Sequence, residues 1–114
     1  MRSSVGDRFP PETDRRLVDW FCRQTGASDL GWVGRFVEHM ASRDWEDELS
    51  RITCPTLIVA PGDEPIGSHG QYERMRERIA NSELLTYEGM AHNIGDSQPE
   101  RCATDLLAFL KRHQ

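Results

Sequence analysis

The chain has 114 residues, a formal net charge of −5, 37% hydrophobic and 29% charged residues. This length and composition are typical of one folded domain with a thin core rather than of a disordered chain. The net negative charge, with basic residues mixed among acidic ones, argues against binding to nucleic acid or to an anionic membrane, and no apolar run approaches membrane-spanning length. We therefore expect a cytoplasmic protein without nucleic-acid or membrane partners.

The first half of the chain is predicted to be helical after an irregular lead-in over residues 1–11. Apolar residues recur at helical spacing from Thr13, and Gly26 offers a stop. A second helix, capped by Ser28 or Asp29, is expected to run to about residue 42. The stretch DWEDELSRI then reads as a short helical or turn element before Pro55.

The second half of the chain alternates strands and helices. TLIVA, residues 56–60, is a continuous β-branched run of the kind found in buried parallel strands, and ELLTY, residues 83–87, is a second strand nearer the sheet edge. Each strand precedes an amphipathic helix, and the capping boxes Ser68/Gln71 and Ser97/Glu100 are expected to begin these helices. The order predicts a βαβ unit with two parallel strands.

Polar loops follow both predicted strands. Asp63 and Glu64 come after the first strand and His92 after the second, so parallel strands would bring a carboxylate and an imidazole to the same edge of the sheet. Such a carboxylate accepts the Nδ1 proton and leaves Nε2 free to take a proton from a nucleophile. By position alone, however, His92 could be an ordinary loop residue and the acids could merely solvate a turn.

Residues 52–112 resemble the last stretch of the α/β-hydrolase fold. The matching strings are ITCPTLIVAPGDEPIG, ELLTYEGMAHNIGDSQPE and DLLAFLKRH, in which a proline-led strand precedes an acid loop and a second strand precedes a Gly-x-x-His loop. The segment SHGQYERMRERI is similar to the 3-oxoadipate enol-lactonase and haloperoxidase-like branch. The resemblance implies an α/β fold with short parallel strands and flanking helices, the C-terminal part of a hydrolase core over residues 52–114, preceded by a helical cap-like segment over 1–51.

The same resemblance implies that His92 corresponds to the triad histidine. Because the family pattern after the strand is Gly-x-x-Asp, an ungapped count from Pro55 places Pro61 at the glycine and Glu64 at the acid. Asp63 is the alternative if the loop has lost a residue. Five aromatic residues of the cap-like segment could line a substrate pocket, although aromatic residues at helical spacing are more often core: Trp20, Phe21, Trp32, Phe36 and Trp45.

The nucleophile of the family lies in G-x-S-x-G, and no serine or cysteine of this chain has that setting. We therefore predict a fragment of a hydrolase acting on an ester, lactone or related carbonyl, inactive alone and needing no metal or organic cofactor. The alternative is a stand-alone binding or assembly module derived from the fold. Uncovered apolar faces favour a homo-oligomer or association with the missing N-terminal half.

Overall fold

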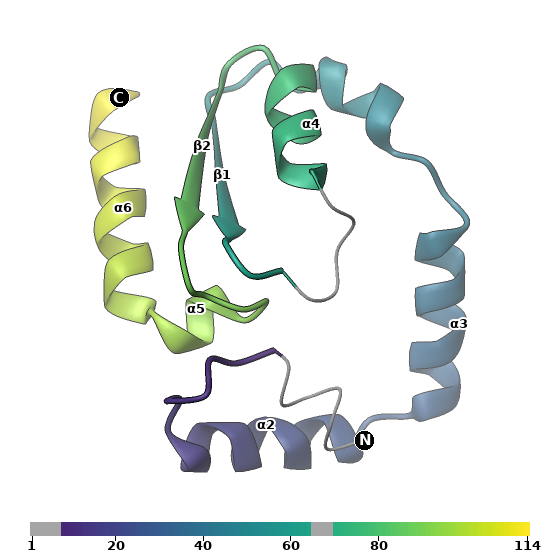
Figure 1. Ribbon diagram of the computed structural model, residues 1–114. Helices are drawn as coiled ribbons and strands as arrows, with labels where there is room; N and C mark the ends of the chain where they lie inside the picture. The colour runs from purple at the N-terminus through teal and green to yellow at the C-terminus, as the bar shows by residue number, and fades with distance from the viewer. Residues whose placement is uncertain (1–7, 65–69) are drawn as a thin grey trace.

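The computed structural model describes residues 8–64 and 70–114. Two parallel strands are flanked by helices (Figure 1), as the sequence predicted. In chain order the elements are α2 (Arg15–Gly26), α3 (Leu30–Ala41), the 3-10 helix η1 (Glu46–Arg51), β1 (Thr56–Pro61), α4 (Gln71–Arg78), β2 (Ser82–Tyr87), α5 (Ile94–Ser97) and α6 (Pro99–Arg112).

The two strands pair in parallel along their whole length. The register runs from Thr56 opposite Ser82 to Pro61 opposite Tyr87, so both strands end at the same level. Figure 1 shows α4 on one side of the sheet and α6 on the other, whereas α2 and α3 lie farther out. This arrangement is the predicted βαβ unit followed by a helix, and it brings the loops after β1 and β2 together.

The core is small and lies around the two strands. Its buried hydrophobic residues are Phe9, Ile58, Ala60, Ile79, Tyr87, Ile94 and Phe109. Tyr87 is fully buried at the end of β2, where its hydroxyl donates a hydrogen bond to Asp105 and the Arg101 guanidinium lies 3.7 Å from its ring centre. Burial raises the pKa of Tyr87. These contacts hold α6 against β2.

Ion pairs connect α4 to η1 on the opposite face. Arg74 Nε lies 3.4 Å from Glu46 Oε1, and Arg78 Nη1 lies 3.8 Å from Asp47 Oδ1. At the other end of α4, Ile79 is only 1% exposed and fixes the helix to the core. The first turn of α4 follows Gly70, whose φ of 71° lies in the left-handed region that favours glycine. The start of α4 is thereby aimed at the loop after β1.

Helix capping agrees only in part with the sequence predictions. Asp29 caps α3 by accepting a bond from the backbone N–H of Trp32, which decides between the two predicted caps. The Ser97 capping box is wrong: α6 begins after Gln98 with no side-chain cap. The reason is that Ser97 ends the short helix α5, and its Oγ is buried without a hydrogen-bond partner among the described residues. The predicted Ser68 cap lies outside the described residues.

The expectation that the aromatic residues of the first half are core is wrong for most of them. Trp20, Trp32, Phe36 and Trp45 are 44–57% exposed, and neither α2 nor α3 has a buried residue. Trp32 and Phe36 stack on each other with ring centres 5.3 Å apart. Helical spacing identified a common face correctly, but no other described element covers that face.

No helix in the described part of the chain combines the length and the apolar character needed to cross a membrane.

Candidate functional site

Backbone hydrogen bonds join the loops that follow the two strands. Beyond the last register pair, the N–H of Gly62 donates to the carbonyl of Tyr87 over 2.8 Å. One residue later, the N–H of Asp63 donates to the carbonyl of Met90 over 3.0 Å. Backbone pairing therefore continues beyond the strands into the two loops. The residues that follow Asp63 and Met90 lie close together as a result.

Gly62 is required by this close approach. A Cβ built on Gly62 would lie 2.8 Å from the Cα of Glu88, a contact that real Cβ atoms essentially never make, and 3.0 Å from the Tyr87 carbonyl oxygen, which is unusually tight. In the other loop, Gly89 has a φ of 72° and turns the chain back after β2. The two glycines thus permit the loops to meet for different reasons, one steric and one conformational.

Glu64 and His92 are in contact at the end of the joined loops. His92 Nδ1 lies 3.0 Å from Glu64 Oε1 and 2.9 Å from Oε2. The Glu64 side chain is 10% exposed and that of His92 is 36% exposed. A largely buried carboxylate therefore faces one ring nitrogen of an accessible imidazole, the arrangement in which the acid fixes the tautomer of the histidine.

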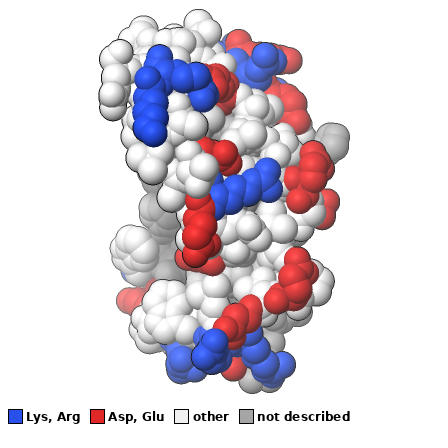
Figure 2. All heavy atoms as spheres, turned by 90° about the vertical axis from the view of Figure 1, so that its left-hand side faces the viewer, with Lys and Arg blue, Asp and Glu red and all other residues white. Residues whose placement is uncertain are grey.

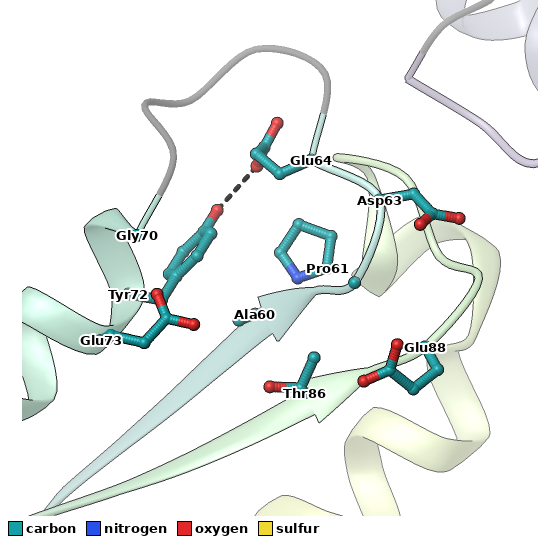
Figure 3. Close-up of a pocket in the computed structure, with 10 residues that line it drawn as sticks. Ala60, Pro61, Asp63, Glu64, Gly70, Tyr72, Glu73, Thr86 and Glu88 are labelled. Atoms are coloured by element: carbon teal, nitrogen blue, oxygen red, sulfur yellow. Dashed lines mark hydrogen bonds between the residues drawn. The ribbon is translucent and has the colours of Figure 1, made fainter.

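Tyr72 is the third member of this cluster. Its hydroxyl, at the start of α4, donates a hydrogen bond of 2.7 Å to Glu64 Oε2 (Figure 3). Burial, reinforced by the hydrogen bond to Glu64, raises the pKa of Tyr72 to about 12, so the phenol stays protonated at neutral pH. The amphipathic pattern of this helix gave no sign of the bond, which joins residues eight apart.

Asp63 takes a different direction from Glu64. Its side chain is exposed and points away from Tyr72 and Glu64 in Figure 3. Within residues 8–64 and 70–114 that side chain makes no hydrogen bond or ion pair. Of the two acids singled out in the sequence, Glu64 is thus the one that contacts His92.

A cavity of about 520 Å³ opens beside Glu64 on the α4 side of the strand ends. Its lining includes Tyr72 and Thr86 together with four acidic residues, Asp63, Glu64, Glu73 and Glu88 (Figure 3). His92 is not part of the lining. The cavity therefore reaches the carboxylate of the pair rather than the imidazole.

No nucleophile meets His92 among the described residues. Its Nε2 makes no hydrogen bond to a serine, threonine or cysteine of this part of the chain, and Cys54 lies before the opposite end of β1. The described residues also contain no group of three or more His, Cys, Asp or Glu side chains arranged to hold a metal ion. Within the part of the chain that the structure describes, the site thus consists of a carboxylate and an imidazole in contact.

Comparison with known proteins gives a consistent answer, although no family profile matches the chain. A non-heme chloroperoxidase from Streptomyces lividans is 30% identical over 98 residues, which cover 83% of this chain and 35% of the relative. A bifunctional esterase/perhydrolase, DCH, from Acinetobacter calcoaceticus is 28% identical over 69 residues, which cover 60% of this chain and 25% of the relative. The structure of MenH from S. aureus matches with a TM-score of 0.55 and 25% identity over 63% of this chain and 27% of MenH.

The matched relatives are α/β-hydrolases, and so is MenH. The chain spans only about a quarter to a third of the length of each. The sequence resemblance, the parallel strands with their flanking helices and the likeness to MenH all agree. The chain belongs to the α/β-hydrolase superfamily and represents part of that fold.

Proposed function

We propose that this chain supplies the acid and the histidine of a Ser-His-Glu triad to a hydrolase whose nucleophile lies outside these 114 residues. The observation that supports this proposal is the contact of 2.9 Å between Glu64 Oε2 and His92 Nδ1, at the carboxyl ends of parallel strands. In this proposal Glu64 accepts the Nδ1 proton, and His92 Nε2 takes the proton of the serine and later gives it to the leaving group.

The proposed substrate is a small ester, lactone or related carbonyl compound. The relative DCH is named an esterase/perhydrolase, and acyl transfer needs only a serine, a base and an orienting acid, without a metal or organic cofactor. Without the serine and the oxyanion donors of the missing part, the 114-residue chain alone is expected to be inactive.

A chimera tests this proposal with defined components. Residues 52–114, the proposed hydrolase-core segment, replace the matching segment of the Streptomyces lividans chloroperoxidase, and hydrolysis of p-nitrophenyl acetate is followed. We expect the chimera to hydrolyse the ester. His92→Ala and Glu64→Gln should each lower kcat/KM by about 10³-fold or more, because triad members act as a unit.

Two matched variants control for general damage. Asp63→Asn changes the neighbouring acid and His113→Ala changes a histidine that contacts Glu83, near the opposite end of β2. Both should retain activity within about threefold. Loss of activity in Asp63→Asn with retention in Glu64→Gln would reverse the assignment of the acid. A folded chimera indifferent to His92→Ala would refute the proposal.

A second candidate function is supported by the exposed apolar side chains. Leu106, Leu107 and Leu110 on α6 are 45–57% exposed, and within the described residues each strand is paired along one edge only. Figure 2 views the side on which α6 lies and shows large uncharged areas between mixed charged groups. Such surfaces favour a homo-oligomer, association with the missing part, or a non-catalytic assembly module.

Light scattering at micromolar concentration tests the assembly proposal. We expect a dimer or larger species for the 114-residue chain, and dissociation in Leu107→Glu, which places a charge on the exposed face of α6. A monodisperse monomer for the unmodified chain would contradict self-association.

A further inference from the structure

We propose that Tyr72 is a positioning residue that holds the Glu64 carboxylate in the orientation that faces His92, a role that rests on the proposed function of this pair. Its hydroxyl donates to Glu64 Oε2 over 2.7 Å, and the same oxygen lies 2.9 Å from His92 Nδ1. One carboxylate oxygen thus receives bonds from two directions. Among the described residues, the Tyr72 hydroxyl bonds to the acid and makes no hydrogen bond to the imidazole.

The acid of this chain needs such a restraint because it is a glutamate. The resemblance to α/β-hydrolases predicts an aspartate at this position, and glutamate has one more rotatable bond, so fixing it costs more side-chain entropy. Both Glu64 oxygens lie at nearly equal distances from Nδ1, 3.0 and 2.9 Å, which requires a defined rotation of the carboxylate. A second hydrogen bond to Oε2 favours that rotation over others.

The placement of Tyr72 suits it for this task. It lies in the first turn of α4, a helix fixed at its other end by the buried Ile79 and along its length by the Arg74–Glu46 ion pair. The donor therefore belongs to a held element rather than to a loop. Because the pKa of Tyr72 is raised to about 12, its proton is available throughout the neutral range.

The consequence is control of the histidine tautomer. A carboxylate that faces Nδ1 stabilises the form protonated at Nδ1, which leaves Nε2 as the acceptor. If Glu64 could rotate freely into the adjacent polar cavity, part of this preference would be lost. Tyr72 thus acts on His92 through Glu64.

The first test is Tyr72→Phe, which removes one oxygen and keeps the ring. The ¹⁵N spectrum of the His92 ring in the 114-residue chain, recorded where the imidazole is neutral, gives the ratio of the Nδ1–H to the Nε2–H tautomer. We expect this ratio to fall by about fivefold, which corresponds to the loss of one ordinary hydrogen bond. The matched control Tyr87→Phe removes the hydroxyl that donates to Asp105 and should leave the ratio unchanged. An unchanged ratio in folded Tyr72→Phe overturns the proposal.

A second measurement works without the Tyr72 substitution. The chain has two tyrosines, so in a Tyr87→Phe background the absorbance of tyrosinate reports Tyr72 alone. Glu64→Gln removes the charged acceptor, and the Tyr72 midpoint should fall from about 12 toward the ordinary value of 10.0. A midpoint that does not move would show that the two groups do not interact, and it too overturns the proposal.

These readouts separate the positioning role from the proposed function, since neither needs a serine or a substrate. In the active chimera, Tyr72→Phe should lower kcat with little change in KM. An inactive chimera combined with the tautomer shift would refute the hydrolase proposal and keep the positioning role. An active chimera in which Tyr72→Phe changes neither the tautomer ratio nor kcat would refute the positioning role and keep the hydrolase proposal.

Discussion

Replacing Gly62 with alanine should disrupt the junction of the two loops. The new Cβ would lie 2.8 Å from the Glu88 Cα and 3.0 Å from the Tyr87 carbonyl oxygen, and both are backbone atoms that a rotamer change cannot move. Overpacking of this kind costs about 1–3 kcal/mol. The 2.8 Å hydrogen bond from Gly62 N–H to Tyr87 is also lengthened if the loops separate. We expect the free energy of unfolding to fall by that amount.

Urea and thermal denaturation followed by circular dichroism measure this loss. For a domain of this size each kcal/mol corresponds to about 4 °C in Tm. Gly34→Ala is the matched control, because Gly34 lies within α3 and its Cβ would meet no atom within 4 Å. That control should stabilise the chain slightly, by about 0.5–1 kcal/mol, since alanine is the better helix former.

The comparison of these two alanine variants decides whether the reasoning holds. If Gly62→Ala is as stable as Gly34→Ala, the two loops are not packed as closely as the Cβ distances require. If Gly62→Ala is destabilised but the His92 tautomer ratio stays unchanged, the loop junction does not position Glu64.

Four further predictions concern the core, the exposed face of α6, the pH dependence of stability and the ion pair of Glu83. Ile79→Ala, at a position 1% exposed, should lower the free energy of unfolding by about 2–5 kcal/mol. Leu107→Ala, at 57% exposure, should change the urea midpoint little at concentrations at which the chain is monomeric. Because burial raises the pKa values of Tyr72 and Tyr87 above 10.0, the folded chain retains protons that the unfolded chain releases. Their contribution to the free energy of unfolding is therefore fully present below pH 10 and is lost as the pH rises from 10 toward 12. Urea titrations at a series of pH values measure this loss, which should be smaller in Tyr87→Phe. The pKa of Glu83 is lowered mainly by its hydrogen bond to His113, but the side chain is exposed. Glu83→Gln should therefore leave the urea midpoint nearly unchanged, while amide hydrogen exchange becomes faster in the last turn of α6.

The local sequence patterns predicted the elements and their order well. TLIVA and ELLTY are strands, they pair in parallel, and helices occupy the expected positions, because apolar periodicity reflects which side of each element is buried. The same logic predicted that Glu64 and His92 emerge at one edge of the sheet.

The remaining features depend on contacts between elements, which local patterns do not contain. Ser97 has the spacing of a capping box, yet it is the last residue of the short helix α5 and does not begin α6. Trp32 and Phe36 have the spacing of core residues, but their face has no covering element among the described residues. The bond between Tyr72 and Glu64 depends on how α4 packs beside the loop after β1, which neither segment specifies alone.

The junction of the two loops also bears on how this site tolerates sequence change. It is made by peptide groups, the N–H of Gly62 and Asp63 with the carbonyls of Tyr87 and Met90. Side chains at Asp63 and Met90 can therefore vary through neutral drift without moving the frame, whereas proline at Gly62 or Asp63 would delete a donor. A saturation library should accordingly be permissive at Asp63, except for proline, and nearly invariant one residue earlier.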